Sequence, residues 1–310
     1  MESKSNWKSV LAAVALLMGS ALTAAQAQTS FPIYVTNQSD DTVTAFTSSG
    51  SSLGVFASGT GLNRPFGLVF DSSGNLYVAN YDSDDIEKFS PTGTDLGVFA
   101  ATGSDTAPYG LAIDGSGNIF AALVTGGAID KITPSGSVST FASSLGVPTD
   151  VAFDSSGNVY ETNNSSNTVN EYTSSGSFIG VFISAGLNAP QGLAFDHSGN
   201  LYVSNSGNNT IEEYTSSGSS LGVFFSSGSL ETPEGLAFDT AGNLYVANAN
   251  NVYGNNILEI TPSGSGSIFA DTTTPAFITF AIPEPSCALL FCVGAAGLAM
   301  VRTRKKQRVK

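Results

Sequence analysis

Basic residues are scarce in this 310-residue chain and lie mostly near its two ends. Between residues 29 and 281 only Arg64, Lys88 and Lys131 are basic, against 23 acidic residues, so this segment carries a charge of about −20. A nucleic-acid-binding protein needs a basic surface that neutralises phosphates. The sequence therefore excludes nucleic acid as a partner.

Histidine and cysteine are nearly absent as well. His197 is the only histidine, and both cysteines, Cys287 and Cys292, lie near the C-terminus. Serine and cysteine nucleophiles normally work with a histidine partner, and His197 occupies a variable position of a repeated turn. We therefore expect no catalytic Ser–His or Cys–His pair. Without cysteines, the body of the chain must be held together by burial.

The N-terminus has the three parts of a secretory signal peptide. Two lysines precede a short apolar stretch at residues 10–18, and Ala25 and Ala27 form an Ala-x-Ala cleavage site. The apolar stretch is shorter than the roughly 20 residues that span a bilayer. We expect a signal helix within residues 1–27 that is removed on export, with an uncleaved anchor as the alternative.

The C-terminus also has three parts. Pro283, Glu284 and Pro285 precede an apolar run from residue 287 to Val301, and a basic tail begins at Arg302. The run contains the expected membrane-anchoring residues Cys287, Leu289, Leu290, Phe291 and Val301. Positive charge stays on the cytoplasmic side of a membrane. We therefore expect a transmembrane helix whose N-terminal side leaves the cytoplasm.

This layout resembles the PEP-CTERM sorting signal of Gram-negative bacteria, over residues 282–310. The resemblance implies an exosortase-like partner that processes the chain near the Pro-Glu-Pro motif. It also implies a protein anchored in the inner membrane before processing and found at the cell surface or outside the cell afterwards. The alternative is a plain tail anchor without processing.

One phrase dominates the sequence between the two ends. A small-and-apolar run, the turn Asp-x-x-Gly-Asn and an alternating run recur five times, with the aspartates at positions 71, 114, 154, 196 and 239. The spacings of 40 to 43 residues are typical of a repeat architecture. Glycine supplies a positive φ in such turns, so each phrase predicts two strands joined by a hairpin.

Two more strands and a second turn follow each phrase, but this second turn occurs six times. The missing strands lie at opposite ends of the body. Residues 33–37 match a second strand without a first, and residues 275–280 match a first strand without a second. Joining them completes a sixth four-stranded sheet. The sequence predicts an all-β fold over residues 28–281, a six-bladed β-propeller closed by its N- and C-terminal strands, with a linear solenoid as the alternative.

The phrase at residues 190–205 and 233–248 resembles the NHL repeat. Propellers of this kind include protein-binding modules, lyases and lactonase-like enzymes, so the resemblance implies the fold rather than one activity. The chain departs from the NHL pattern in two places. Asparagine stands where an acidic residue is common after Tyr-Val-Ala, and Thr210 stands where arginine is common.

Some residues break the repeat near the expected channel. Asp150 replaces a glycine at the start of an inner strand, Glu161 replaces a valine, and Gln191 and Glu234 follow the repeated proline. Asp150 and Glu234 could hold Ca²⁺, which prefers oxygen ligands, and the resemblance to lactonase-like propellers implies a divalent cation there. We expect instead that both are solvated channel residues and that the protein has no cofactor, with the calcium site as the alternative.

These observations favour an exported, non-enzymatic binding or scaffold module at the cell surface or in the extracellular matrix. Its expected ligand is a protein or a polysaccharide, and the acidic body disfavours anionic polymers. The alternative is a Ca²⁺-dependent, lactonase-like hydrolase with a carboxylate as general base. A structural component of the envelope without a defined ligand is a third interpretation.

Overall fold

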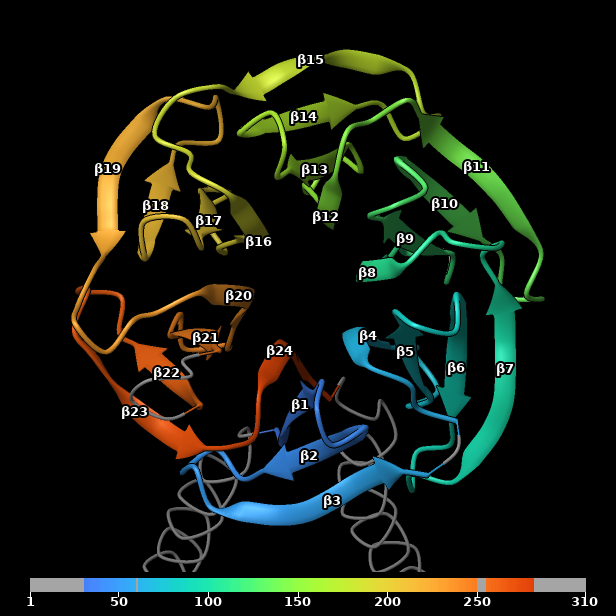
Figure 1. Cartoon of the computed structure of the whole chain (residues 1–310). Coiled ribbons are helices and arrows are strands. Elements are labelled where there is room, and N and C mark those ends of the chain that lie inside the picture. Colours follow the sequence, from blue (N-terminus) through green and yellow to red (C-terminus); the bar gives the residue numbers. More distant parts are fainter. Residues whose placement is uncertain (1–30, 60, 250–254, 282–310) are drawn as a thin grey trace, which may run out of the picture.

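The computed structural model describes residues 31–59, 61–249 and 255–281. Within these residues, 24 strands form six antiparallel sheets of four strands each. The sheets stand as blades around a central channel, with one strand of each blade innermost (Figure 1). The predicted six-bladed, all-β propeller is confirmed.

The blades are numbered along the chain. Blade I consists of β24 (Pro275–Phe280), β1 (Ile33–Asn37), β2 (Thr42–Phe46) and β3 (Ser52–Ser58). Blade II consists of β4 (Pro65–Phe70), β5 (Leu76–Asn80), β6 (Asp85–Phe89) and β7 (Asp95–Ala101). Blade III consists of β8 (Pro108–Ile113), β9 (Ile119–Leu123), β10 (Ala128–Ile132) and β11 (Val138–Ser143).

The second half of the ring follows the same order. Blade IV consists of β12 (Pro148–Phe153), β13 (Val159–Asn163), β14 (Thr168–Tyr172) and β15 (Phe178–Ile183). Blade V consists of β16 (Pro190–Phe195), β17 (Leu201–Asn205), β18 (Thr210–Tyr214) and β19 (Ser220–Phe225). Blade VI consists of β20 (Pro233–Phe238), β21 (Leu244–Asn248), β22 (Asn256–Ile260) and β23 (Gly266–Asp271).

Blade I closes the ring with strands from both ends of the described chain. β24 pairs antiparallel with β1, so that Tyr34 lies opposite Thr279 and Val35 lies opposite Ile278. Figure 1 shows the red β24 beside the blue β1. This pairing confirms the predicted closure and excludes the linear solenoid. It also leaves no unpaired inner strand at either end of the repeat array.

The repeated aspartates form the hairpins between the first and second strands of their blades. Asp71 Oδ1 accepts hydrogen bonds from the backbone N–H groups of Ser73 and Asn75, each at 2.9 Å, and Gly74 has a φ of 79°. The same two backbone bonds recur at Asp114, Asp154, Asp196 and Asp239. These aspartates are therefore turn formers, as their recurrence predicted.

Aromatic side chains fill the space between neighbouring blades. Tyr202 of blade V lies between Phe224 of its own blade and Phe238 of blade VI, with each pair of ring centroids 4.9 Å apart in edge-to-face geometry. Tyr160, Phe182 and Phe195 repeat the arrangement one blade earlier. Each aromatic cluster thus belongs to two sheets, which ties successive blades together.

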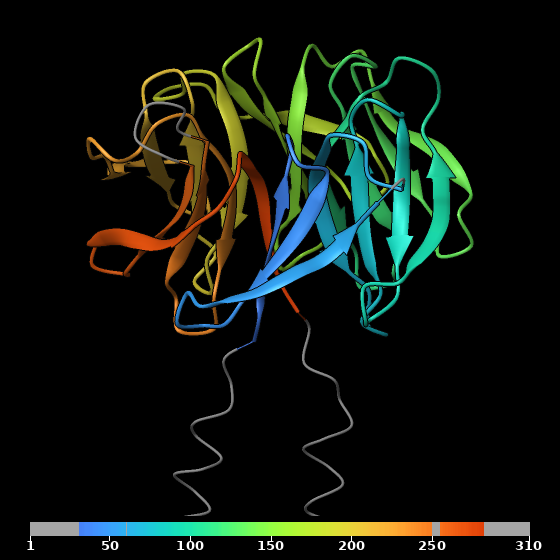
Figure 2. The same ribbon diagram turned by 60° about the horizontal axis from the view of Figure 1, so that its bottom comes forward.

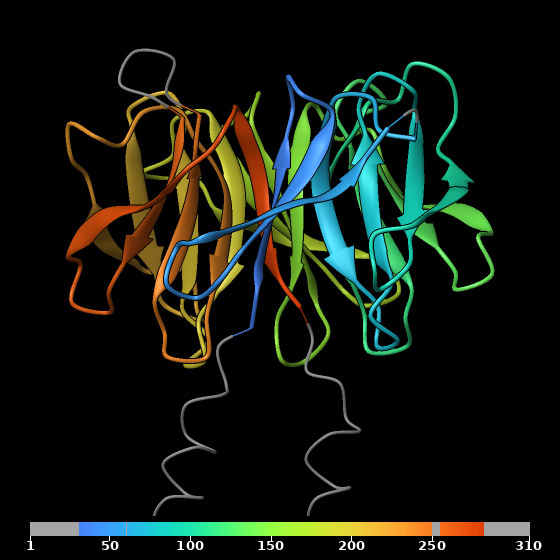
Figure 3. The ribbon, with the colours of Figure 1, turned by 90° about the horizontal axis from the view of Figure 1, so that it is seen from below.

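The ring has two different faces. The prolines that begin the inner strands lie at one face, which we call the mouth face. The Asp-x-x-Gly-Asn turns lie at the other, which we call the turn face. Both ends of the described chain lie at the turn face, where the Ala281 N–H donates to the Pro32 carbonyl at 3.3 Å (Figures 2 and 3).

The expected signal peptide at residues 1–27 and the sorting signal at residues 282–310 lie outside the described residues. Their cleavage site, motif and transmembrane helix therefore stay predictions. In the part of the chain that the structure describes, no helix has the length and apolar character needed to cross a membrane.

Candidate functional site

A cavity of about 220 Å³ lies at the mouth face, over the central channel. All six blades, or the loops that lead into and out of them, contribute to it. Its lining residues are Gln38, Arg64, Phe66, Tyr81, Tyr109, Val124, Val147, Thr149, Asn164, Gln191 and Glu234. These residues occupy three repeated positions. Two flank the proline that begins an inner strand, one just before it and one just after it, and the third begins the loop after the second strand.

The closed ring brings these positions together. The six inner strands contact one another in a continuous circle, so the residues after their prolines converge although they lie about 40 positions apart in sequence. Phe66 and Tyr109 are stacked, with ring centroids 4.1 Å apart and ring planes at 28°. Thr149 bonds through Oγ1 to the Gln191 carbonyl at 3.0 Å. The cavity wall is thus partly fixed by contacts between blades.

Glu234 is the carboxylate of this cavity. Gln38 Nε2, from blade I, donates to its Oε1 and Oε2 at 3.2 and 3.1 Å. Burial raises the pKa of Glu234 to about 8, although hydrogen bonds from Gln38 and Tyr109 and the charge of Arg64 act in the opposite direction. A carboxyl group with such a pKa exchanges protons near neutral pH.

Arg64 is the cation of the cavity and lies against aromatic rings. Its guanidinium carbon is 4.7 Å from the centroid of Tyr81 and 5.6 Å from that of Phe66. Its Nη1 atom is 3.6 Å from Asp82 Oδ1, in an ion pair open to solvent. The cavity therefore offers one positive group, one carboxyl group, amide side chains and aromatic surface.

Asp150 is a buried residue of the inner strand β12 and does not line this cavity. Its Oδ1 accepts the backbone N–H of Val151 at 2.9 Å, and its Oδ2 accepts that of Leu193 on β16 at 3.0 Å. Gly110 lies so close to this carboxylate that a Cβ there would clash with it. Burial raises the pKa of Asp150 to about 8, while the two backbone hydrogen bonds lower it. The side chain therefore links blades IV and V.

A calcium site at Asp150 and Glu234 stays a prediction, and the surroundings of the two carboxyl groups do not favour it. Both oxygens of Asp150 accept backbone hydrogen bonds, and the positive charge of Arg64 shares the cavity with Glu234. Within the described residues, no group of three or more histidine, cysteine, aspartate or glutamate side chains could hold a metal ion. The donor set of the mouth cavity fits Ca²⁺ poorly, since this ion takes six to eight oxygen ligands.

Sequence reasoning found Gln191 and Glu234 through their place after the repeated proline, but it missed Gln38, Arg64 and Tyr81. These three lie in loops at the ends of strands, where the repeat is weakest. The signal that could have found them is their position. Gln38 and Tyr81 each follow the asparagine that ends a second strand, and Arg64 precedes an inner-strand proline.

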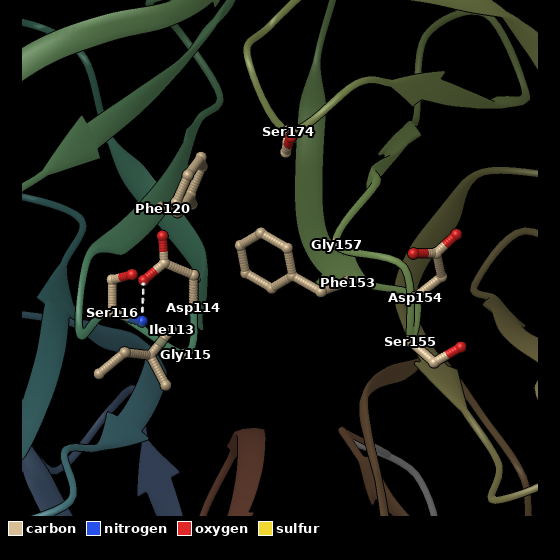
Figure 4. A pocket seen from close by; sticks show the side chains of 10 residues that line it. All are labelled: Ile113, Asp114, Gly115, Ser116, Phe120, Phe153, Asp154, Ser155, Gly157 and Ser174. Atoms are coloured by element: carbon tan, nitrogen blue, oxygen red, sulfur yellow. Dashed lines mark hydrogen bonds between the residues drawn. The ribbon is translucent and has the colours of Figure 1, made fainter.

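Cavities at the turn face have a different character. One of about 380 Å³ lies between blades III and IV, with Phe120 and Phe153 between the turns of Asp114 and Asp154 (Figure 4). Both aspartates hold their own turns, and Figure 4 shows the bond from the Ser116 N–H to Asp114. These carboxylates are structural, so we do not assign this cavity a function.

His197 lies at the turn face too. It is exposed in the turn between β16 and β17, as its place in the repeat predicted, and it lines a cavity between blades IV and V. The only histidine of the chain is therefore at the opposite end of the ring from the mouth cavity.

Several solved structures share this architecture. The catalytically inactive histidine-to-alanine variant of virginiamycin B lyase from Staphylococcus aureus, determined with quinupristin, is 16% identical, with a TM-score of 0.62, over 82% of this chain and 93% of that one. A chain of the nidogen/laminin complex is 18% identical, with a TM-score of 0.71, over 82% and 98%. A candidate gluconolactonase is 18% identical, with a TM-score of 0.61, over 71% and 82%. No curated protein matches the chain significantly.

At these identities the structural likeness shows the fold alone. Fold and site together define a six-bladed β-propeller with a polar cavity at the mouth of its channel. The model of the virginiamycin B lyase family matches residues 18–270, so the chain belongs to that family.

Proposed function

We propose that the protein is an exported binding module that holds its ligand in the mouth cavity and performs no chemistry on it. The observation that carries this proposal is the composition of the cavity. Side chains from six blades converge there with amides, aromatic rings, one guanidinium and one carboxyl group, and the lining residues in the described chain include no histidine or cysteine. Such a surface recognises a ligand by hydrogen bonds and stacking.

The chemistry of the cavity favours a polysaccharide over an apolar ligand. Gln191 Oε1 is buried and has no hydrogen-bond partner, so a ligand hydroxyl could donate to it. Gln38, Asn164 and Glu234 add further amide and carboxylate groups, and Tyr81 and Tyr109 add aromatic surface. The small volume suits the end of a chain or one exposed unit rather than a long stretch of polymer.

The position of the chain ends suits display of the mouth at a surface. Residues 32 and 281 meet at the turn face, so a chain held through its C-terminus presents the mouth face outward. Export and sorting rest on the signal peptide and the PEP-CTERM resemblance. Intact-mass measurement of exported protein should show the tail removed, and a mass that includes residues 286–310 would contradict exosortase processing.

A glycan array with the full-length protein tests the binding proposal. Arg64→Ala and Glu234→Gln should each weaken binding of a captured glycan by about tenfold, since the first removes a charged donor and the second replaces the carboxyl group by an amide. His197→Ser, at the turn face, is the matched control and should bind like the parent. Equal binding by all three variants would place the ligand elsewhere.

A lyase or hydrolase is the second candidate. Its support is the family match and the pKa of Glu234, about 8, which suits a general acid or base at neutral pH. The Staphylococcus aureus relative is inactive once a histidine is replaced by alanine, whereas the only histidine here is far from the mouth cavity. The family resemblance therefore supports this candidate more than the site does.

Activity assays distinguish the two candidates. The parent protein is incubated with quinupristin and with simple lactones, and its melting temperature is measured with Ca²⁺ and with EDTA. Turnover that Glu234→Gln abolishes would establish the enzyme. No turnover, together with a melting temperature that neither additive changes, leaves the binding module.

A further inference from the structure

A second polar cavity lies between blades III and IV, away from the channel. Its volume is about 380 Å³. It is lined by Ser143, Ser144, Leu145, Gly146, Asn163, Ser165, Ser166, Asn170, Tyr172 and Phe178. Three departures from the repeat meet around it: a buried acid, an exposed aromatic ring and a shortened loop.

The buried acid is Glu161 on β13. The equivalent positions of blades II, V and VI hold Val78, Val203 and Val246. Glu161 is 0% exposed, and its Oε1 has no hydrogen-bond partner. Burial of a carboxylate without a full set of partners is costly, whereas valine would fill the same place without that cost. The residue therefore needs an explanation other than packing.

The cavity wall connects directly to this carboxylate. Asn170 Nδ2 donates to Glu161 Oε2 at 2.8 Å, and Tyr172 Oη donates to the same oxygen at 3.4 Å. Both donors line the cavity, so Glu161 lies immediately behind its wall. The hydrogen-bond partners of the carboxylate are neutral side chains, and burial raises the pKa of Glu161.

The exposed ring is Phe178 at the start of β15. It lies opposite Tyr172, at a position that holds serine or aspartate in blades I, II and V. Phe178 is 59% exposed, and its centroid is 5.4 Å from that of Tyr172 at a tilt of 56°. Two aromatic rings thus flank the cavity beside the buried acid.

The loop into blade IV is short. It contains residues 144–147, whereas the loop into blade V contains residues 184–189. In blade V the longer loop places the Gly186 carbonyl 3.1 Å from Asn205 Nδ2. In blade IV the equivalent Asn163 lines the cavity instead. The loop into blade IV is two residues shorter, so it leaves open a space whose equivalent in blade V is covered by the longer loop.

The charges of this region determine which ligand the cavity suits. Residues 148–281 contain twelve acidic residues and no lysine or arginine. The lysine of blade III, Lys131, lies elsewhere, 3.9 Å from Asp114 and over the ring of Phe120. A carboxylate, two aromatic rings and the oxygens of serine and asparagine side chains together recognise an ammonium group.

We propose that the cavity between blades III and IV binds a primary ammonium group, with Glu161 as its counter-charge and Tyr172 and Phe178 as its aromatic walls. The ammonium group can belong to a free diamine or to an amino sugar. The Ser165 hydroxyl oxygen accepts a hydrogen bond from it. This site is separate from the mouth cavity and uses none of its residues.

Calorimetric titration of the full-length protein tests the proposal. The probes are putrescine, as a free diamine, and glucosamine, as an amino sugar, with neutral N-acetylglucosamine as the control ligand. At least one of the two amines should bind with saturation, and N-acetylglucosamine should not. Glu161→Gln should weaken the binding about tenfold or more, because the counter-charge is lost while the shape is kept. Comparison of the two amines identifies the source of the ammonium group.

Two further variants keep the outcome unambiguous. Glu212→Gln changes the buried acid of blade V and should bind the probe like the parent. Glu161→Val carries the residue of the sibling blades, so it should fold, melt at least as high as the parent and lose binding. Absence of saturable binding by either amine would overturn the proposal, as would full affinity in Glu161→Gln. Unchanged amine binding in Glu234→Gln separates this site from the mouth cavity.

Discussion

Blades II and III differ from blades IV, V and VI at one position of the third strand. In blades II and III this position is lysine, and Lys88 and Lys131 lie over the rings of Tyr77 and Phe120, with Nζ 5.0 and 5.2 Å from the centroids. In blades IV to VI the position is glutamate. The tyrosine hydroxyls there donate to Glu171, Glu213 and Glu259 at 2.9, 2.7 and 3.0 Å.

The comparison shows that one geometry accepts either charge. An aromatic ring attracts a cation through its face, and a tyrosine hydroxyl donates to a carboxylate. The same pair of cross-strand positions can therefore hold an aromatic residue with either a lysine or a glutamate. Charge is therefore distributed unevenly around the ring. All three lysine and arginine residues of the propeller lie before residue 148, and the charged side chains of the half after it are all acidic. The blades share their packing but not their electrostatics.

The largest expected effect tests the shared packing. Tyr202→Ala in blade V and Phe120→Ala in blade III should each lower the free energy of unfolding by about 3–5 kcal/mol, because each removes a buried ring from between two blades. Denaturant unfolding measures both. If the free energy of unfolding fell less than half as much in one variant as in the other, the two halves would not be packed in the same way.

The dependence of stability on pH gives an effect of intermediate size. Burial raises the pKa values of Glu87, Asp150 and Glu234 to about 8, Glu87 with a further contribution from nearby Asp95. Carboxyl groups of the unfolded chain ionise near pH 4, so between about pH 5 and 8 the folded protein holds more protons. Stability should therefore fall as the pH rises through this range and level off above it.

Variants show how much each half of the ring, before or after residue 148, contributes to the slope of stability against pH. Asp150→Asn and Glu234→Gln together should flatten it more than Glu87→Gln alone, because two of the three groups lie in the acidic half. Thermal melts at several pH values provide the measurement. A slope that all the variants retain would contradict these shifted pKa values.

The smallest expected effect converts one type of blade into the other. Tyr202→Phe should cost about 1–2 kcal/mol, because the hydrogen bond to the Glu213 carboxylate is lost. Adding Glu213→Lys reproduces the phenylalanine–lysine pair of blade III and should recover part of the loss. A double-mutant cycle measures the recovery. A double variant that is less stable than Tyr202→Phe would show that the two arrangements are not interchangeable.

Much of the fold could be predicted because strand and turn formation in the repeat depend on residues that are near one another in sequence. Asp71 and its four counterparts mark every complete hairpin, and the two unmatched strands at residues 33–37 and 275–280 indicate how the ring closes. The sites could be predicted only in part. Glu161 and Glu234 stand out because they break the repeat, whereas Gln38 and Tyr81 lie in loops and are marked only by their place after the asparagine that ends a second strand.

The amino-acid pattern alone establishes the number of blades, the turns and the surplus of negative charge, since these depend on neighbours in sequence and on composition. Which side chains meet was decided only by the closed ring, which brings Gln38 to Glu234 across 196 positions. The ring also gives Asp150 its hydrogen-bond partner on β16, 43 positions away in sequence. Contacts over such distances depend on blade packing, and no local rule of strand or turn formation contains that information.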